Sequence, residues 1–107
     1  MWNYSFYVYI LTNESKRVLY TGVTSDLVKK VSDHKEKKAK GFSTKFEVDQ
    51  LIYFEWFANK EDAIAKEKQI RSESRENKLE LVNSANKNWK DLSNELWSDK
   101  RVLRASA

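Results

Sequence analysis

Two short runs decide the fold of this chain: YVYIL at residues 7–11 and LYTGV at residues 19–23. Both runs are rich in aromatic and β-branched residues, which pack well on a pleated, half-buried sheet. The polar stretch between them is too short for a crossover connection, so the two strands should pair as an antiparallel hairpin. We expect a four-residue loop at residues 13–16.

Side chains alternate between the two faces of a strand. With that loop, Tyr9 would lie opposite Tyr20 on one face of the hairpin. Gly22 would share this face, where a missing side chain leaves room for another group to approach the backbone. The simplest interpretation of the tyrosines is an apolar face with phenols at its rim, since a buried tyrosine usually finds a polar partner and does no chemistry.

The composition describes a soluble globular protein with a hydrated, charged surface. The chain has 107 residues, enough for one modest core, with 40% hydrophobic and 34% charged residues. It contains no cysteine, which excludes disulfides and thiolate metal sites. No apolar run approaches the roughly 20 residues that span a bilayer, and residues 1–5 do not resemble a signal peptide. We therefore expect a cytoplasmic protein with no membrane partner.

Positive charge is concentrated in one segment. Residues 29–45 carry seven lysines against Asp33 and Glu36, a net charge of +5, whereas the whole chain carries +4. Such a cluster is typical of proteins that bind a nucleic-acid phosphate backbone, although a solvated lysine-rich helix end would have the same composition. The lysines expected to contact DNA, or RNA, through its phosphates are Lys29, Lys35, Lys37, Lys38, Lys40 and Lys45.

The remaining elements follow from caps and apolar periodicity. Residues 24–26 can cap a helix with Leu27, Val28 and Val31 at helical spacing, which should fade near residues 38–41. Asn59 and Ser74 can cap two more helices. The expected strands span residues 6–12, 18–23 and 50–57, with a loop at 42–48, and the closing apolar segment contains Trp89, Leu92, Leu96 and Trp97.

These elements constrain the topology. A right-handed crossover makes the second and third strands parallel, and the first strand can lie between them. The chain is therefore expected to form an α+β domain over residues 1–97, a three-stranded antiparallel sheet in the order 2-1-3 packed with about three helices. Residues 98–107 are charged or small and are expected to fray.

Glu67 is the unusual residue of the second predicted helix. It lies on the apolar side, four residues after Ala63 and three before Ile70. A carboxylate in that position is costly unless something pairs with it. An ion pair with Lys66 or Lys68 is one explanation, although neither neighbour faces the same way as Glu67.

The spacing Tyr-x-Tyr and then Tyr-x-Gly resembles the signature of the GIY-YIG nuclease superfamily. Here the two tripeptides read YVY at 7–9 and YTG at 20–22. The resemblance extends over roughly residues 4–97, through the segments 23–27, 63–70 and 86–92 and through His34. It is strongest to the small stand-alone bacterial members, and it implies the same 2-1-3 sheet and a DNA endonuclease that uses one divalent ion.

The resemblance also implies roles for particular side chains. Glu67 would hold the Mg²⁺ or Mn²⁺ ion, because these ions prefer oxygen ligands and keep several waters. Tyr20 would be the general base, which a phenol with an ordinary pKa of about 10 can be only beside cations. Tyr9 and His34 would position the water or the scissile phosphate; alternatively, His34 is a surface helix histidine. Asn86 is carried over from the segment after the third helix.

One residue departs from the family pattern. Eight residues after the glycine of the second tripeptide, the family has an arginine that clamps the phosphate, and this chain has Lys30. Lysine keeps the charge but loses the planar fork that holds two phosphate oxygens at once. The resemblance therefore implies a metal-dependent endonuclease, slowed by Lys30; the alternative is a non-catalytic nucleic-acid-binding protein on the same scaffold. It does not predict the substrate or the oligomeric state.

Overall fold

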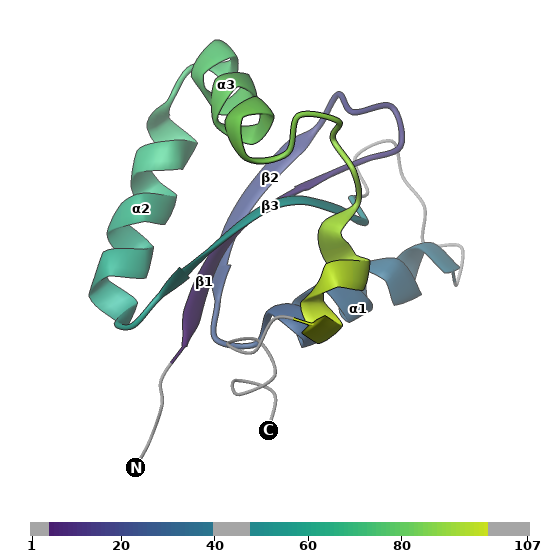
Figure 1. The fold of residues 1–107 in the computed structure, drawn as a ribbon, viewed down its shortest axis with the longest axis horizontal. Helices are drawn as coiled ribbons and strands as arrows, with labels where there is room; N and C mark the ends of the chain where they lie inside the picture. Colours follow the sequence, from purple (N-terminus) through teal and green to yellow (C-terminus); the bar gives the residue numbers. More distant parts are fainter. Residues whose placement is uncertain (1–4, 40–47, 99–107) are drawn as a thin grey trace.

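The computed structural model describes residues 5–39 and 48–98, and its centre is a three-stranded antiparallel sheet in the order β2-β1-β3 (Figure 1). The strands are β1 (Phe6–Thr12), β2 (Leu19–Thr24) and β3 (Gln50–Phe57). The α+β fold and the strand order predicted from the sequence are thus confirmed. The first and third strands have the predicted bounds, and the second begins and ends one residue later than predicted.

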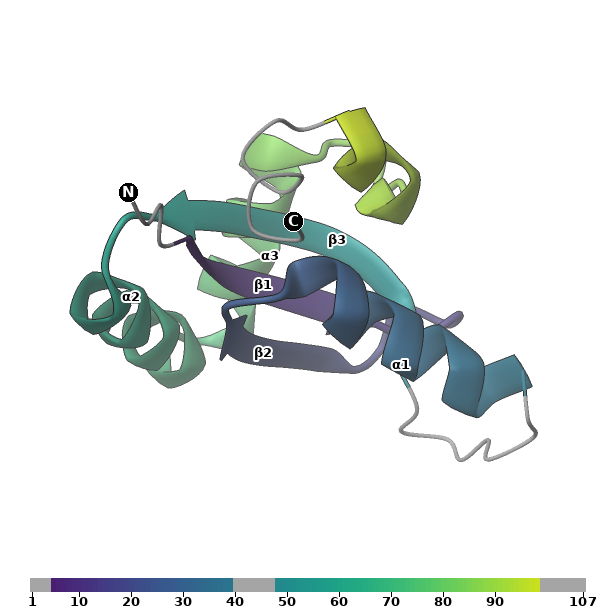
Figure 2. The same ribbon diagram turned by 90° about the horizontal axis from the view of Figure 1, so that it is seen from below.

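Helices cover both faces of the sheet. They are α1 (Leu27–Ala39), α2 (Lys60–Ser72) and α3 (Arg75–Ala85), followed by a 3₁₀ segment, η1 (Leu92–Ser98). Figure 1 shows α2 and α3 on one side of the sheet and α1 and η1 on the other, and Figure 2 shows α1 lying along the opposite face from α3. Along the described stretches of chain, every helix is too short or too polar to cross a bilayer.

Side-chain caps fix where the helices begin. Asp26 accepts a hydrogen bond from the backbone N–H of Lys29 at 3.1 Å, at the start of α1. Asn59 accepts from the N–H of Asp62 at 2.9 Å at the start of α2. Ser74 does the same for α3. Each of these contacts satisfies a donor that the first helical turn leaves unpaired, so all three predicted helix starts are confirmed.

The two faces of β1 carry separate parts of the core. Tyr7, Tyr9 and Leu11 pack against α1 and η1, with Leu96 buried among them. The alternate residues, Val8 and Ile10 among them, pack against α2 and α3. The predicted closing segment does cover the core, since Leu92 lies against the first cluster and Trp89 against the second; the side chain of Trp97 lies outside the described residues.

The predicted hairpin register is wrong. Tyr9 pairs with Gly22, and Tyr20 pairs with Leu11, because the loop spans residues 13–18 and not 13–16. The side chain of Asn13 folds this longer loop by accepting hydrogen bonds from the backbone N–H groups of Arg17 at 3.0 Å and Val18 at 3.3 Å. Tyr9 and Tyr20 still share a face, because Tyr20 lies opposite a residue two positions from Tyr9.

Some predicted features lie outside the described residues. These are the loop at residues 42–47 and the C-terminal tail from residue 99. The predicted loop includes Val48, which is described and buried.

Candidate functional site

The site begins where Tyr9 crosses Gly22. Tyr9 is 2% exposed, and its ring covers the glycine of the neighbouring strand. A Cβ atom at position 22 would lie 2.5 Å from the Tyr9 hydroxyl oxygen and 2.6 Å from Cζ. The sequence predicted that some group would approach this glycine, and that group is the phenol of Tyr9, which reaches from the central strand over the edge strand β2.

Three rings form a row from the sheet to α1. The ring centroids of Tyr9 and Tyr20 are 6.3 Å apart, and those of Tyr20 and His34 are 5.9 Å apart. Tyr20 lies in the middle and is 46% exposed, whereas Tyr9 is buried. The accessible phenol of Tyr20 therefore lies between the buried phenol of Tyr9 and the imidazole of His34.

The environment of Tyr9 keeps its hydroxyl protonated. Burial raises the pKa of Tyr9 to about 12, helped by a hydrogen bond with the Tyr20 phenol and by the charge of Glu67. A protonated phenol donates, so Tyr9 can supply a hydrogen bond to an oxygen at the site but cannot serve as a base near neutral pH.

Glu67 approaches from the other side of the sheet. It belongs to α2, is 6% exposed, and lies on the same side of the helix as the buried Ala63 and Ile70. Because α2 packs against both β1 and β2, this carboxylate can influence Tyr9 across the edge strand. The candidate site therefore has residues on both faces of β2 around Gly22, the position where this strand carries no side chain.

The partner of Glu67 is Arg71, one helical turn later. Arg71 Nη2 forms an ion pair with Glu67 Oε2, and the same nitrogen donates to the backbone carbonyl of Thr21 at 3.4 Å. An ion pair with Lys66 or Lys68, the alternative left open by the sequence, is therefore not what balances this buried charge. Sequence reasoning missed Arg71, although its spacing of four residues from Glu67 is the signal that could have revealed it.

His34 is held in its neutral form. Burial lowers the pKa of His34 below 6.5, and the positive charges of Lys37 and Lys30 lower it further, against a hydrogen bond to the backbone of Val48. A neutral imidazole can accept a hydrogen bond from water as well as donate one. The effect of Lys30 on His34 places its charge beside the ring row, as the spacing of four residues on α1 requires.

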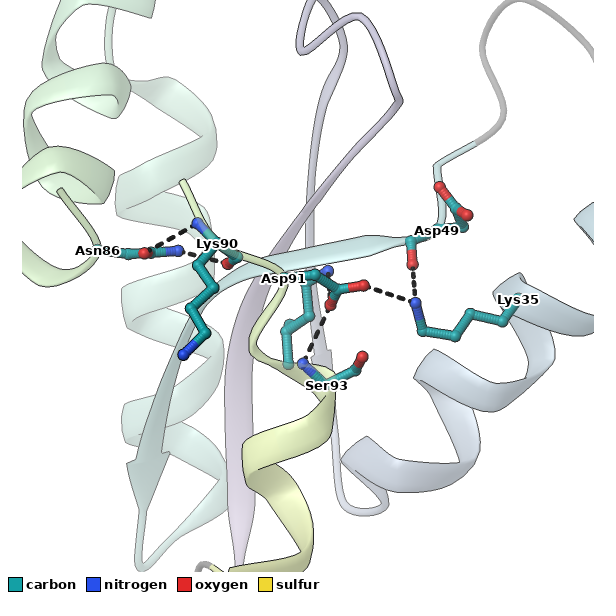
Figure 3. A network of polar contacts seen from close by, with 7 residues as sticks. Lys35, Asp49, Asn86, Lys90, Asp91 and Ser93 are labelled. Carbon is teal, nitrogen blue, oxygen red and sulfur yellow. Dashed lines mark hydrogen bonds and ion pairs between the residues drawn. The ribbon is translucent and has the colours of Figure 1, made fainter. Parts of the chain in front are cut away.

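The lysines of α1 do not form one uniform surface. Lys35 Nζ donates to Asp91 at 2.7 Å and to the backbone carbonyl of Asp49 at 2.9 Å, so it ties α1 to the start of β3 and to the segment before η1 (Figure 3). Lys29 is exposed and pairs with Asp33 at 3.5 Å. Lys37 is also exposed. The side chain of Lys38, and the whole of Lys40 and Lys45, lie outside the described residues.

Asn86 lies in a loop and its amide is fully engaged there. Its Nδ2 donates to the carbonyl of Ile52 at 3.1 Å. Nδ2 also donates to the carbonyl of Lys90 at 2.7 Å, and Oδ1 accepts from the N–H of Lys90 (Figure 3). These contacts hold the chain after α3 against β3. They leave both amide hydrogens occupied, which favours a structural role for Asn86 over contact with a substrate.

The donor set suits a hard divalent ion that keeps most of its waters. Arg71 contacts Oε2 of Glu67, so Oε1 remains available as a ligand. Residues 5–39 and 48–98 contain no group of three His, Cys, Asp or Glu side chains that could enclose a metal. A single carboxylate beside phenolic oxygens fits Mg²⁺ or Mn²⁺, which bind one or two carboxylates plus substrate phosphates, and does not fit a closed zinc site.

Comparison with known proteins gives a consistent result. The model of the GIY-YIG catalytic domain matches residues 5–80. A UPF0213 protein of Clostridium perfringens is 36% identical over 78 residues, which cover 73% of this chain and 83% of that protein. A UPF0213 protein of Haloquadratum walsbyi is 35% identical over 76 residues, covering 71% and 84% respectively. The solution NMR structure of a UPF0213 protein from Bacillus halodurans has a TM-score of 0.52 and 28% identity, covering 81% of this chain and 92% of that one.

Proposed function

This chain belongs to the GIY-YIG family, whose members are usually nucleases that act on DNA with divalent ions, and from that premise we propose that it is a metal-dependent DNA endonuclease. One observation carries the proposal. Tyr9, Tyr20 and His34 form a row of rings, and Arg71 ties the buried carboxylate of Glu67 to the backbone of Thr21, which lies between Tyr20 and Gly22. Phosphodiester hydrolysis needs a base, hydrogen-bond donors and a cation site, and these side chains supply all three.

Tyr20 is the proposed general base. It is the accessible phenol of the row, and it shares a hydrogen bond with Tyr9. A hydrogen bond donated to an oxygen stabilises negative charge on it, which suits an oxygen that must take a proton from water. The water oxygen then bonds to phosphorus as the ester P–O bond breaks, and the leaving oxygen takes a proton from solvent.

The other residues bind and orient. Tyr9 donates from a hydroxyl that stays protonated. The neutral His34 donates its N–H to the backbone of Val48, so its other ring nitrogen accepts from the attacking water. Glu67 would hold one Mg²⁺ or Mn²⁺ ion, which neutralises charge on the phosphate when bound. Lys30 adds positive charge beside His34. Lys29 and Lys37, which are exposed on α1, are proposed to contact neighbouring phosphates.

The test is cleavage of supercoiled plasmid in Mn²⁺. The protein should nick the plasmid, whereas Glu67→Gln should not, because the amide loses the charge that attracts the cation. Glu80→Gln removes a carboxylate from the exposed face of α3 and is the matched control, which should cleave like the unchanged protein. Equal nicking by Glu67→Gln and the unchanged protein would reject this assignment.

A non-catalytic nucleic-acid-binding protein is the second candidate. It is favoured by the ion pair between Glu67 and Arg71, which balances the carboxylate without a metal. This candidate predicts DNA binding that weakens steeply with salt, because lysine–phosphate contacts release counterions, and no cleavage of supercoiled, branched or single-stranded DNA in Mn²⁺. Tight binding without cleavage would select it.

A further inference from the structure

The guanidinium of Arg71 is placed beside the candidate site. Its Nη2 contacts Glu67 and the carbonyl of Thr21, the residue between Tyr20 and Gly22 on the edge strand. The Arg71 side chain is nevertheless 65% exposed, in contrast to 7% for Glu67. One nitrogen therefore anchors the guanidinium to the site while the rest of the group faces outward.

The anchoring leaves half of the guanidinium open. An arginine has five N–H donors in a rigid plane. Both contacts of Arg71 within the described part of the chain use Nη2, so Nη1 and Nε are not engaged there. Each of these nitrogens can donate a charge-assisted hydrogen bond to a phosphate oxygen while Nη2 stays on Glu67, so the guanidinium can bridge the carboxylate and a phosphate.

We propose that Arg71 donates from its free guanidinium nitrogens to the scissile phosphate, adding a guanidinium contact where Lys30 offers only a point charge. The proposal rests on the nuclease function proposed above and extends it to a phosphate-binding residue on α2. Glu67 orients Arg71 through Oε2, and its Oε1 would hold the cation, which would supply further positive charge to the same phosphate. Lys30 adds charge from α1 on the other side.

A simpler role for Arg71 is to neutralise Glu67. The two roles differ in what a lysine can do at this position. Lysine can pair with Glu67 four residues earlier on α2, so Arg71→Lys retains the counter-ion. It loses the separate nitrogens that reach past Glu67 to a phosphate, because an ammonium group is a point charge. Arg71→Lys therefore separates phosphate binding from charge balance.

The first test is the cleavage rate of a plasmid or branched duplex by Arg71→Lys in Mn²⁺. Loss of one preorganised contact to the transition state should lower the rate by about 10²–10³-fold. Thermal stability and Mn²⁺ affinity, measured by calorimetry, should change little. Arg75→Lys is the matched control, since Arg75 is exposed on α3 and contacts only the carbonyl of Lys16 among the described residues. An Arg71→Lys variant as fast as the unchanged protein would overturn the proposal.

The second test is rescue by Lys30→Arg. If either arginine can grip the phosphate, Lys30→Arg should raise the rate of the Arg71→Lys variant far more than it raises the rate of the unchanged protein. Equal effects in both backgrounds would mean that the two positions act independently and would contradict the proposal.

A third readout does not depend on cleavage. In an NMR titration with a short branched duplex and no divalent ion, the Nε–H resonance of Arg71 should shift, and that of Arg75 should not. If the protein cleaves nothing, the proposed nuclease function fails, and this titration still decides whether Arg71 binds phosphate. An Arg71 resonance that does not move while the lysine-rich helix responds to DNA would overturn the inference.

Discussion

Replacing Gly22 with alanine should destabilise this protein, although the same change stabilises most strands. Glycine in a strand interior usually costs about 0.5–1 kcal/mol relative to alanine. Here the new methyl group would lie 2.5 Å from the Tyr9 hydroxyl oxygen and 2.6 Å from Cζ, so the ring must move. Tyr9 is 2% exposed and has little room. Overpacking of this kind costs about 1–3 kcal/mol, which predicts a net loss of about 1–2 kcal/mol in the free energy of unfolding.

The assay is urea unfolding in a double-mutant cycle with Tyr9→Leu. Leucine lacks the ring end that covers Gly22, so Gly22→Ala should be neutral or stabilising in the Tyr9→Leu background. The coupling between the two changes should be comparable to the destabilisation itself. If Gly22→Ala stabilises the unchanged protein, or costs the same in both backgrounds, then Tyr9 does not lie over Gly22 and the geometry of the site is different.

Other predictions concern α1 and its contacts. Lys35→Ala should lower the free energy of unfolding by about 1 kcal/mol, because the partly buried Asp91 carboxylate loses its counter-ion and keeps only its backbone hydrogen bonds. Lys29→Ala should cost much less, since its ion pair with Asp33 is exposed; urea midpoints compare the two variants. Burial alone would raise the pKa of Asp91, but hydrogen bonds from Lys35 and a neighbouring backbone N–H hold that pKa below 3.8. The stability that Asp91 contributes is therefore present above pH 4 and is lost as the pH falls further. In pH-dependent unfolding, Asp91→Asn should reduce this loss of stability at acid pH. His34 should titrate below pH 6.5 in an NMR experiment, mainly because it is buried, and Lys37→Ala should shift that midpoint upward.

The sheet and the helix starts could be predicted because their causes are local. Aromatic and β-branched runs select strands. A capping side chain such as Asn59 or Ser74 bonds to an N–H three residues later, so its effect can be read from a few neighbouring residues. The hairpin register was predicted incorrectly, because it depends on the length of the loop, which is set by the hydrogen bonds of the Asn13 side chain. Lys16 also takes a left-handed backbone conformation there, with φ of 61°.

The candidate site was predictable in its residue types more than in its contacts. The ring row follows from strand alternation and from helix spacing, which a sequence displays directly. The role of Lys35 does not, because its partner Asp91 lies 56 residues away and meets it only when η1 folds back onto α1. The pair of Glu67 with Arg71 is different, because residues four apart on a helix share a face and the spacing is visible in the sequence, whereas the adjacent Lys66 and Lys68 face other directions.

The central claim is that Glu67 and the ring row around Gly22 form one cation site. Paramagnetic broadening by substoichiometric Mn²⁺ in NMR spectra of ¹⁵N-labelled protein tests it most directly, because broadening falls off steeply with distance from the ion. The account predicts that the amide signals of Gly22 and Glu67 broaden first, that those of Asp91 do not, and that Glu67→Gln removes the effect. Broadening centred near Asp91, or unchanged broadening in the Glu67→Gln variant, would contradict it.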